Sequence, residues 1–426
     1  MDTGSLVLLI TLLMAVFFAI GVPVVLCMGV WATSVLYFTE AMPIMNIGQG
    51  AFFGLSSFAL LAMPLFILTG DLVREGGIAR RFITLSKAML ARLPARLPVS
   101  TLGASAMFSA ISGSNAATTA TLGRMMIPSM VEERAPTAFA AAVTAAGGTL
   151  GIMIPPSLIM IVYGVLMNVS PSDLFIAGLL PGLLMVVGMV LITVFIGWKK
   201  GWTAPVEKEA PVSVWKAAWD AKSGAGAMVI GLGGIYAGIF SPTEAAGIAA
   251  AYCLIIGVFL TKELKVGKIG NVLFSSGAVA GIIAPIVAFA MVIQEVVTVL
   301  SLQDAIWEFV LGFASSPLAI LGIAMIAVLI FGCVLESIPN IIILAPIFAP
   351  LAIDAGVDPI HFAIVFVMGS TIGFITPPYG LNLFVASSVS GASIFSISRA
   401  VLPYLVMLII VWIIVALVPS ISLFLL

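Results

Sequence analysis

Long runs of apolar residues dominate the chain, and short polar stretches divide them. The first run extends from about residue 6 to residue 38 without a charged side chain. A run of about 20 apolar residues is long enough to cross a bilayer as a helix. Because such runs recur up to the C-terminus, the pattern predicts an all-α polytopic membrane protein with about 11 membrane-crossing helices.

Composition supports a chain that faces lipid. Hydrophobic residues make up 62% of the 426 residues and charged residues only 8%, whereas soluble domains average about 25% charged residues. A soluble enzyme and a nucleic-acid binder are therefore excluded. The chain has three Cys without a CxxC pair, and we expect them to be small buried apolar side chains. Its single His, His361, is expected to be solvated in a loop beside Asp358. With no GxSxG, HExxH or Walker motif, we predict that the protein is not an enzyme.

Charged residues indicate which ends of the runs share a side of the membrane. Lys and Arg cluster in 74–96, 199–222 and 262–268, whereas other loops carry acids without bases, such as Glu40 and Glu244. The positive-inside rule assigns the basic loops to the cytoplasm. One alternating path then fits all the loops, with the N-terminus in the cytoplasm and the C-terminus on the outer side.

Three stretches do not fit simple crossings. Residues 98–131 and 317–352 are apolar, but each begins and ends on the same side and has a polar or Pro-containing middle, 112–115 and 336–339. Both are predicted to be re-entrant helical hairpins, which are tolerated only where protein or a wet cavity surrounds the turn. Residues 76–97 alternate apolar and basic positions at helical spacing, which favours an amphipathic interfacial helix over a solvated loop.

An internal repeat relates the two halves of the chain. Residues 147–156 read GGTLGIMIPP and residues 369–378 read GSTIGFITPP, an offset of 222 residues. The same offset superposes the two predicted hairpins and places Pro128 on Pro350. Because an odd number of crossings separates equivalent elements, the halves are predicted to be inverted relative to each other. Inverted repeats with broken helices are typical of secondary transporters.

The repeated motif is expected to break its helix. Two consecutive prolines after two glycines remove backbone donors and leave carbonyls unpaired, which is costly in hydrocarbon. A cation satisfies such carbonyls, and helix N-termini suit an anionic substrate group. We therefore predict broken helices over 135–167 and 359–391, and at least two Na⁺ sites where they meet the hairpin turns. No organic cofactor is expected.

Each site has a predicted set of residues. The first Na⁺ site comprises Ser109, Ser112, Asn115, Gly151, Ile154 and Pro156, the last two through main-chain carbonyls, and the second comprises Gly332, Gly373, Thr376 and Tyr379. The substrate is expected between the hairpin tips, near Ser114, Asn115, Pro339, Asn340 and Asn382. Two charged residues are assigned to neither the ion sites nor the substrate site. As an intramembrane acid, Glu336 is a candidate to bind a cation, carry a proton or pair with Arg. Arg124 either draws in an anion or extends to the cytoplasmic face.

Several of these segments together resemble one family. The chain is similar along its whole length to the large membrane subunit of tripartite ATP-independent periplasmic (TRAP) transporters. The resemblance is carried by SGSNAATTATLGRMMIPSM (112–130), AGGTLGIMIPPS (146–157), SPTEAAG (241–247), LESIPNIIILAPIFAPLA (335–352) and GFITPPYGLNLF (373–384). Two departures from the family pattern are Asn115, where a small residue is expected, and Arg124, where a small polar residue is common.

The resemblance implies a function and a fold. TRAP large subunits are Na⁺-coupled importers of organic acids, such as C4-dicarboxylates or sialic acids. A periplasmic binding protein delivers the solute, and a small membrane subunit of the DctQ/SiaQ type accompanies the permease. The implied fold is of the elevator type, as in the ion transporter superfamily. A transport domain (98–198 and 303–426) would move against a scaffold (1–97 and 199–302), with 76–97 as a linking arm.

The residues alone leave alternative functions open. A proton-coupled transporter of the same architecture would use Glu336 as its carrier. Ser, Thr and carbonyl oxygens without a ladder of buried acids favour Na⁺ instead. An ion channel or a structural membrane subunit is less compatible with two unlike, repeat-related sites in one chain. An intramembrane enzyme lacks a nucleophile and base.

Overall fold

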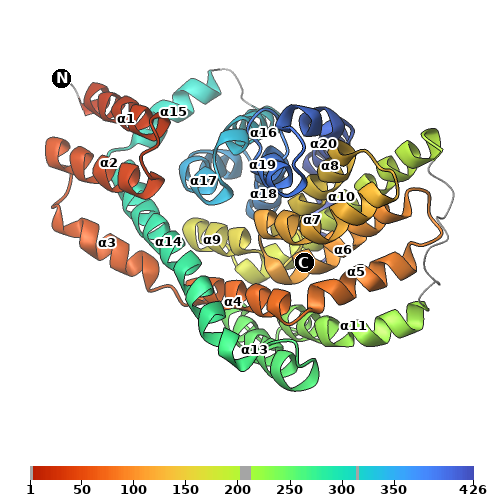
Figure 1. Cartoon of the computed structure of the whole chain (residues 1–426). Coiled ribbons are helices and arrows are strands. Elements are labelled where there is room, and N and C mark those ends of the chain that lie inside the picture. Colours follow the sequence, from red (N-terminus) through yellow and green to blue (C-terminus); the bar gives the residue numbers. More distant parts are fainter. Residues whose placement is uncertain (1–2, 202–212, 313–315) are drawn as a thin grey trace.

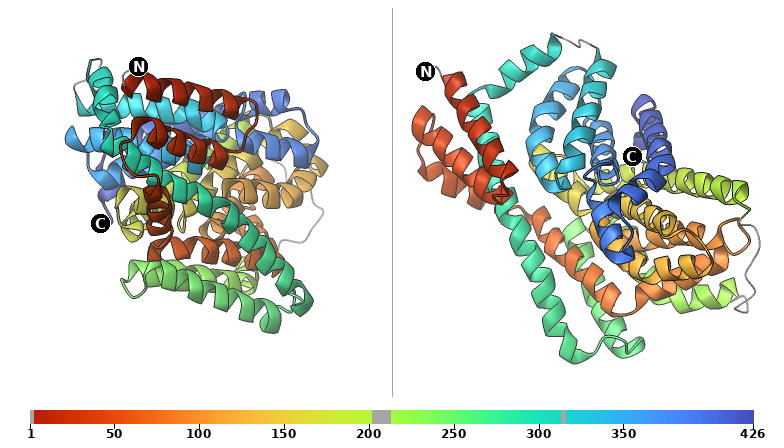
Figure 2. Two further views of the ribbon diagram at one scale, coloured as in Figure 1. Left: turned by 90° about the vertical axis from the view of Figure 1, so that its left-hand side faces the viewer. Right: turned by 45° about the horizontal axis from the view of Figure 1, so that its top comes forward.

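A long helix along one edge of the molecule connects a small group of N-terminal helices to a larger bundle (Figure 1). The computed structural model describes residues 3–201, 213–312 and 316–426, and within these ranges it consists of helices and connecting turns without a strand. Helix α14 (Val266–Val299) runs from the N-terminal helices at one end to α13 (Pro242–Ile255) at the other, and the right-hand view of Figure 2 shows it beside the bundle that holds the C-terminal half.

The N-terminal helices pack along α14. They are α1 (Thr3–Ala19), α2 (Val24–Thr39), α3 (Met45–Leu55), η1 (Phe58–Leu61) and α4 (Ala62–Glu75). The axis bends by 61° between α3 and the η1–α4 segment. The second half supplies α11 (Val214–Met228), η3 (Val229–Gly233), α12 (Gly234–Tyr236), α13, η4 (Ile256–Leu260) and α15 (Leu302–Leu311). The SPTEAAG motif begins α13 with a capping box, in which Ser241 and Glu244 bind each other's backbone N–H groups.

Two helical hairpins occupy the stretches with polar middles. The first consists of α6 (Arg96–Ser112) and α7 (Asn115–Glu132), and the second of α16 (Pro317–Val334) and α17 (Ser337–Asp354). Gly113 has a φ of +59°, a conformation that L side chains rarely adopt, so glycine suits this tight turn. The tips are thus Gly113–Ser114 and Leu335–Glu336, at equivalent positions of the repeat.

Both Pro-Pro motifs interrupt a helix. The first interruption lies between α8 (Thr137–Gly148), continued by the short turn η2 (Thr149–Ile152), and α9 (Leu158–Met167). The second lies between α18 (Pro359–Gly373) and α19 (Leu381–Ser390). Helices α10 (Pro171–Lys199), α20 (Ile394–Leu417) and α21 (Ser420–Leu423) pack beside these segments.

The number of membrane crossings is smaller than the expected eleven when judged by helix length. Of the described helices, six are long and apolar enough to cross a membrane, and seven if the bent α3–α4 pair counts as one span. Helices α1, α2, α8, α9, α18 and α19 are apolar but only 10–17 residues long. Length and composition therefore support six or seven spans, a number that includes α16 and α17. The helices interrupted by the Pro-Pro motifs are not counted, because each of their pieces is too short.

The basic segment 76–97 forms a shorter helix than predicted. Helix α5 covers only Ile78–Met89, and the chain then turns before α6 begins at Arg96. The apolar side of α5 is buried rather than presented to lipid, because Ile78 and Phe82 pack against Gly224 of α11. Ser86 donates a hydrogen bond to the Ser100 carbonyl of α6 at 2.7 Å. The periodicity predicted the apolar face of this helix, but it did not show that other helices of the protein cover that face.

The expectation that His361 is solvated is wrong. His361 lies in the first turn of α18 and is 2% exposed. Its Nδ1 atom is 2.7 Å from Ser422 Oγ, and its Nε2 atom is 3.3 Å from the Ala416 carbonyl. The C-terminal segment covers the ring, a long-range contact that the local sequence does not reveal. The expectation that the three cysteines are buried is confirmed.

Candidate functional site

Each hairpin contacts the helix break of its own half. Gly151 of the first break lies against the tip, since a Cβ atom there would be 2.4 Å from the Ser114 carbonyl oxygen. Gly373 of the second lies against α16, where a Cβ atom would be 2.4 Å from the Gly332 carbonyl carbon. Both distances are far below van der Waals contact, so only glycine permits this approach of two backbones. The repeat motif therefore positions a hairpin on each break, through the tip in the first half and through Gly332 of α16 in the second.

Asn115 joins the first tip to both breaks. Its Oδ1 atom accepts a hydrogen bond from Ile152 N at 3.0 Å, and its Nδ2 atom donates to Thr371 Oγ1 at 2.8 Å. Thr371 in turn donates to the carbonyl of Thr149 at 2.5 Å, whereas the Thr149 hydroxyl donates to Ala146 in its own helix. Thr149 and Thr371 are equivalent residues of the repeat. Residues of the two halves thus meet in one buried hydrogen-bonded group.

Several buried side-chain oxygens in the hairpins and broken helices have no protein partner. Ser112 Oγ lies 2.8 Å from Thr118 Oγ1. In the described part of the chain, five buried side-chain atoms lack a hydrogen-bond partner, namely Ser105 Oγ, Ser109 Oγ, Ser337 Oγ, Asn340 Oδ1 and Asn382 Oδ1. Buried polar atoms are normally hydrogen-bonded, so such a concentration requires an explanation. A bound cation would satisfy oxygens of this kind.

The residues predicted for the second ion site are only partly brought together. Gly332 and Gly373 touch, and the Cys333 thiol donates to the Thr376 carbonyl at 3.1 Å. The Thr376 hydroxyl donates to the Ile372 carbonyl at 3.0 Å. The Tyr379 side chain is 61% exposed and takes part in none of the hydrogen bonds found between described residues. In the first site, the Pro156 carbonyl faces Gly113, and Ile154 packs partly buried against the core.

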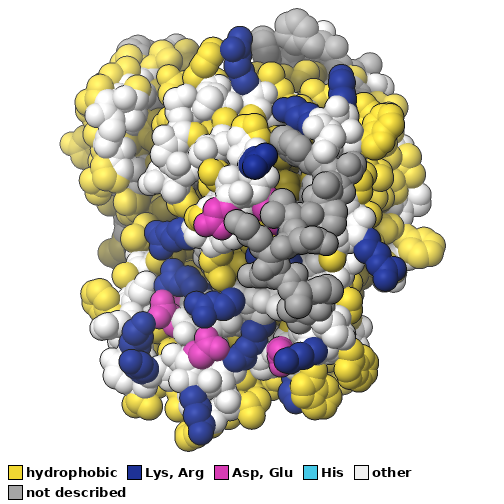
Figure 3. Space-filling view, turned by 45° about the vertical axis from the view of Figure 1, so that its right-hand side comes forward, with side chains coloured by type: hydrophobic (Ala, Val, Ile, Leu, Met, Phe, Trp, Pro, Cys, Tyr) yellow, Lys and Arg dark blue, Asp and Glu magenta, His cyan; other side chains and the backbone are white. Residues whose placement is uncertain are grey.

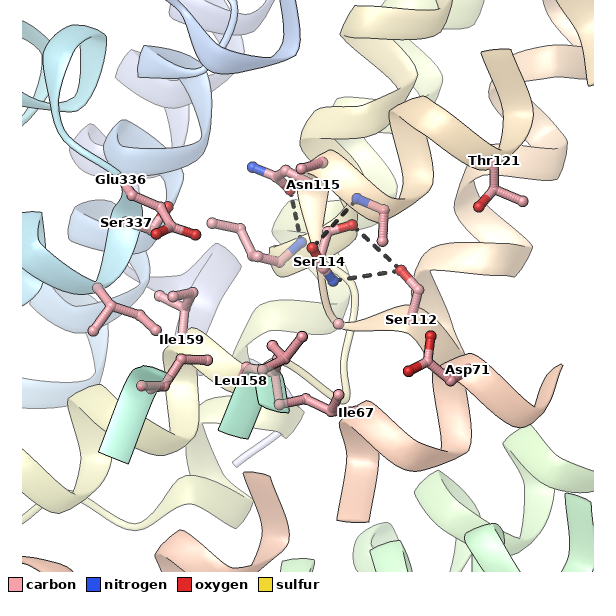
Figure 4. A pocket seen from close by; sticks show the side chains of 18 of the residues that line it. Ile67, Asp71, Ser112, Ser114, Asn115, Thr121, Leu158, Ile159, Glu336 and Ser337 are labelled. Atoms are coloured by element: carbon pink, nitrogen blue, oxygen red, sulfur yellow. Dashed lines mark hydrogen bonds between the residues drawn. The ribbon is translucent and has the colours of Figure 1, made fainter. Parts of the chain in front are cut away.

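A cavity of about 280 Å³ lies between the two hairpin tips and the helices α4 and α14. Ser112, Ser114 and Asn115 line it from the first hairpin, and Glu336 and Ser337 line it from the second. Figure 4 shows Glu336 and Ser337 on the side opposite Ser112 and Asp71. Ser114 and Glu336 are equivalent in the repeat, and each precedes the second helix of its hairpin. The cavity is thus centred on the two tips.

Four of the residues predicted for the substrate site or for a charge role do not line this cavity. Asn340 and Asn382 are fully buried behind it, where Asn340 Nδ2 donates to Ser370 Oγ at 3.2 Å and Asn382 Nδ2 donates to the Ala145 carbonyl at 3.0 Å. Pro339 is also buried, and Arg124 is exposed on α7 beyond the lining residue Thr121. Asn340 and Asn382 therefore brace the hairpins and broken helices in this structure.

Comparison with known proteins assigns the family. Residues 11–421 match the family described as "Tripartite ATP-independent periplasmic transporter, DctM component". The chain belongs to the DctM family of TRAP transporter permeases. It is 40% identical to the C4-dicarboxylate TRAP transporter large permease protein DctM of Pseudomonas aeruginosa, over 86% of each chain. It is 32% identical to the sialic acid TRAP transporter large permease protein SiaM of Vibrio cholerae, over 95% of each.

Another relative of this DctM-family chain is longer. The chain is 38% identical to the isethionate TRAP transporter permease protein DctMQ of Oleidesulfovibrio alaskensis over 96% of its own length, but it covers only 65% of that relative.

Solved structures share the fold. The YdaH transporter of Alcanivorax borkumensis has a TM-score of 0.62 at 16% identity, with 88% of each chain covered. MtrF of Neisseria gonorrhoeae has a TM-score of 0.58 at 18% identity, covering 88% of this chain and 83% of MtrF.

The cavity of this DctM-family permease includes charged residues that the sequence reasoning missed. Asp71 and Arg74 line it from α4 and form an ion pair of 3.2 Å. Ser276 of α14 donates to the second carboxylate oxygen of Asp71 at 2.8 Å. The sequence did contain a signal for this pair, because Asp71 and Arg74 are an acid and a base one helical turn apart in a mostly apolar segment.

Proposed function

We propose that the protein is the large permease subunit of a Na⁺-coupled TRAP transporter that imports an organic acid by an elevator movement. The observation that carries the proposal is the paired arrangement of tips and breaks. Gly151 and Gly373 each contact the hairpin of their own half, and both hairpin tips line a single cavity. Secondary transporters bind substrate and ions where such broken helices meet between inverted repeats.

Sodium is the proposed coupling ion because the hairpin tips and helix breaks are rich in uncharged oxygen ligands, namely hydroxyls and main-chain carbonyls. Ser109 Oγ is buried without a protein partner, close to the tip, and the breaks leave main-chain carbonyls outside regular helical bonding. Among described residues there is no cluster of His, Cys, Asp and Glu suited to another metal. Hard cations prefer oxygen ligands of this kind.

The position of the cavity supports an elevator movement. Its lining joins the proposed transport domain (98–198 and 303–426) to α4 and α14 of the proposed scaffold (1–97 and 199–302). A substrate held there would move with the tips past Asp71 and Arg74. Arg74 is the one basic residue of the lining and offers a partner for a carboxylate.

The family supports the choice of substrate and partners. Relatives are named for C4-dicarboxylate, sialic acid and isethionate, which favours a small organic acid. We propose that a small membrane subunit and a periplasmic binding protein complete the transporter, and that the chain spans the bacterial inner membrane with its N-terminus in the cytoplasm and its C-terminus in the periplasm.

Sodium should stabilise the purified protein. In detergent, the melting temperature is expected to be a few degrees higher in NaCl than in KCl or choline chloride of equal ionic strength, because a ligand at ten times its Kd adds about 1.4 kcal/mol. Ser109→Ala should abolish this difference while the protein still folds, because the hydroxyl has no protein partner to lose.

Ser105→Ala is the matched control. Ser105 Oγ is also buried without a partner, one helical turn earlier on α6, but it packs against Gly147 away from the tip. This variant should keep the full sodium effect. An equal melting temperature in all three salts for the wild-type chain would contradict sodium coupling.

A proton-coupled transporter is the second candidate, because Glu336 lines the cavity at the tip of the second hairpin. We expect Glu336→Gln to retain Na⁺-driven uptake when it is reconstituted with its partner proteins, and a pH gradient alone to drive no uptake by the wild type. Glu40→Gln, at an exposed acid of the α2–α3 turn, controls for the loss of one charge. Uptake driven by a pH gradient in the wild type but not in Glu336→Gln would favour the proton carrier.

A further inference from the structure

A second cavity is lined by residues that belong to neither hairpin tip. It has a volume of about 450 Å³ and lies between α5, α11 and the turn that joins η4 to α14. Its polar lining consists of Arg80, Arg81, Thr84, Asp220, Lys222, Ser223, Thr261 and Glu263. Nothing in the proposed transport cycle uses these residues.

Two of the basic residues in this cavity are not committed to an ion pair. Arg81 pairs with Glu263 at 2.9 Å and also donates to Ser223 Oγ at 3.1 Å. Arg80 and Lys222 are exposed and belong to none of the ion pairs found in the described ranges. Lys222 Nζ lies 3.6 Å from the centre of the Trp219 ring. With three basic and two acidic residues, the lining has one excess positive charge.

Exposed apolar side chains adjoin the charged lining. Trp219 and Leu260 line the cavity, and Trp215 and Phe259 are 79% and 72% exposed beside them in the sequence. Figure 3 brings this side of the molecule forward, and Lys and Arg side chains gather on its lower part with acidic and hydrophobic ones among them. Tryptophans beside basic residues are typical of the level at which lipid headgroups meet acyl chains.

We propose that this cavity binds the headgroup of an anionic phospholipid. The single excess positive charge matches one phosphodiester, which Arg80 and Lys222 would hold, and Asp220 would accept a hydrogen bond from a headgroup hydroxyl. The acyl chains would lie over Phe259 and Leu260. Basic pockets between helices on the cytoplasmic side commonly hold anionic headgroups, and the positive-inside rule assigns these loops to that side.

The bound lipid would fix α5 in place. Helix α5 leads directly into the first hairpin and is tied to it by the hydrogen bond from Ser86 to Ser100. On its other side it packs against α11 through Gly224. A lipid bridging Arg80 and Lys222 would hold α5 to α11 and so stabilise the connection between the hairpin and the rest of the chain.

Lipid titration of the delipidated protein tests this site. Phosphatidylglycerol is expected to raise the melting temperature and to remain bound in native mass spectrometry, and phosphatidylcholine and phosphatidylethanolamine are expected to do neither. The variant Arg80→Gln/Lys222→Gln should bind phosphatidylglycerol roughly tenfold more weakly, because each basic residue near an anionic headgroup contributes substantially to binding. Arg92→Gln/Lys216→Gln removes two exposed charges from α11 and the turn after α5, outside the cavity, and should bind like the wild type.

Three results would overturn the proposal. The first is equal retention of the three lipids, and the second is equal affinity of the two double variants. The third is the same rise in melting temperature with inorganic phosphate alone, which would identify a site for free anions. If Arg80→Gln/Lys222→Gln fails to fold, Lys222→Gln alone is compared with Lys216→Gln, and a several-fold difference in affinity is still expected.

Discussion

Replacing Gly373 with alanine is expected to separate the second hairpin from its helix break and to abolish transport. The new Cβ atom would lie 2.4 Å from the carbonyl carbon of Gly332, and 2.6 Å from its oxygen. Both groups are backbone, so no side chain can rotate away and the helices must move apart. Overpacking of this kind costs about 1–3 kcal/mol. The melting temperature and its sodium dependence should therefore both fall.

The repeat provides an internal test and the chain provides a control. Gly151→Ala should have the same effect on the first hairpin, because its Cβ atom would lie 2.4 Å from the Ser114 carbonyl oxygen. Gly322 lies in the interior of α16 with open space around it, and Gly322→Ala should be neutral or slightly stabilising. A Gly373→Ala protein that melts and responds to sodium like Gly322→Ala would show that the close contact is not required.

Removing the Asn115 side chain should cause the largest loss of stability among the polar substitutions. Asn115→Ala breaks two buried hydrogen bonds and leaves Ile152 N without its acceptor. An unsatisfied buried group costs about 1–3 kcal/mol, so we expect a loss of about 3 kcal/mol, measured as a lower melting temperature, together with loss of transport.

Asn271→Ala provides the comparison for Asn115. Asn271 is exposed on α14, and its replacement should change stability by less than about 0.5 kcal/mol. If the two alanine variants melted at the same temperature, Asn115 would not connect the halves in solution.

Local chemistry explains why the breaks and turns could be predicted. Proline and glycine act on their own backbone, so the Pro155–Pro156 and Pro377–Pro378 pairs mark the interruptions wherever the chain folds. The repeat then aligned each interruption with a polar turn. The resemblance of several segments to TRAP large subunits identified the family, which the comparisons confirm.

Long-range packing explains what could not be predicted. An amide side chain binds either an ion or a neighbouring helix, and its sequence position does not distinguish them, so Asn340 and Asn382 were assigned to a cavity that they do not reach. Asp71 and Arg74 lie outside the repeat motifs, and only the tertiary structure shows them across from the hairpin tips.

The contact between Thr149 and Thr371 has a consequence for symmetry. If the halves are inverted repeats, the pseudo-twofold axis would pass between these equivalent residues, because they touch. A symmetric pair would have each hydroxyl donating to the carbonyl of the other residue. Thr371 donates across the axis, whereas the Thr149 hydroxyl turns back to Ala146. The two copies of the motif thus differ in their hydrogen bonds at this contact, although their sequences match there.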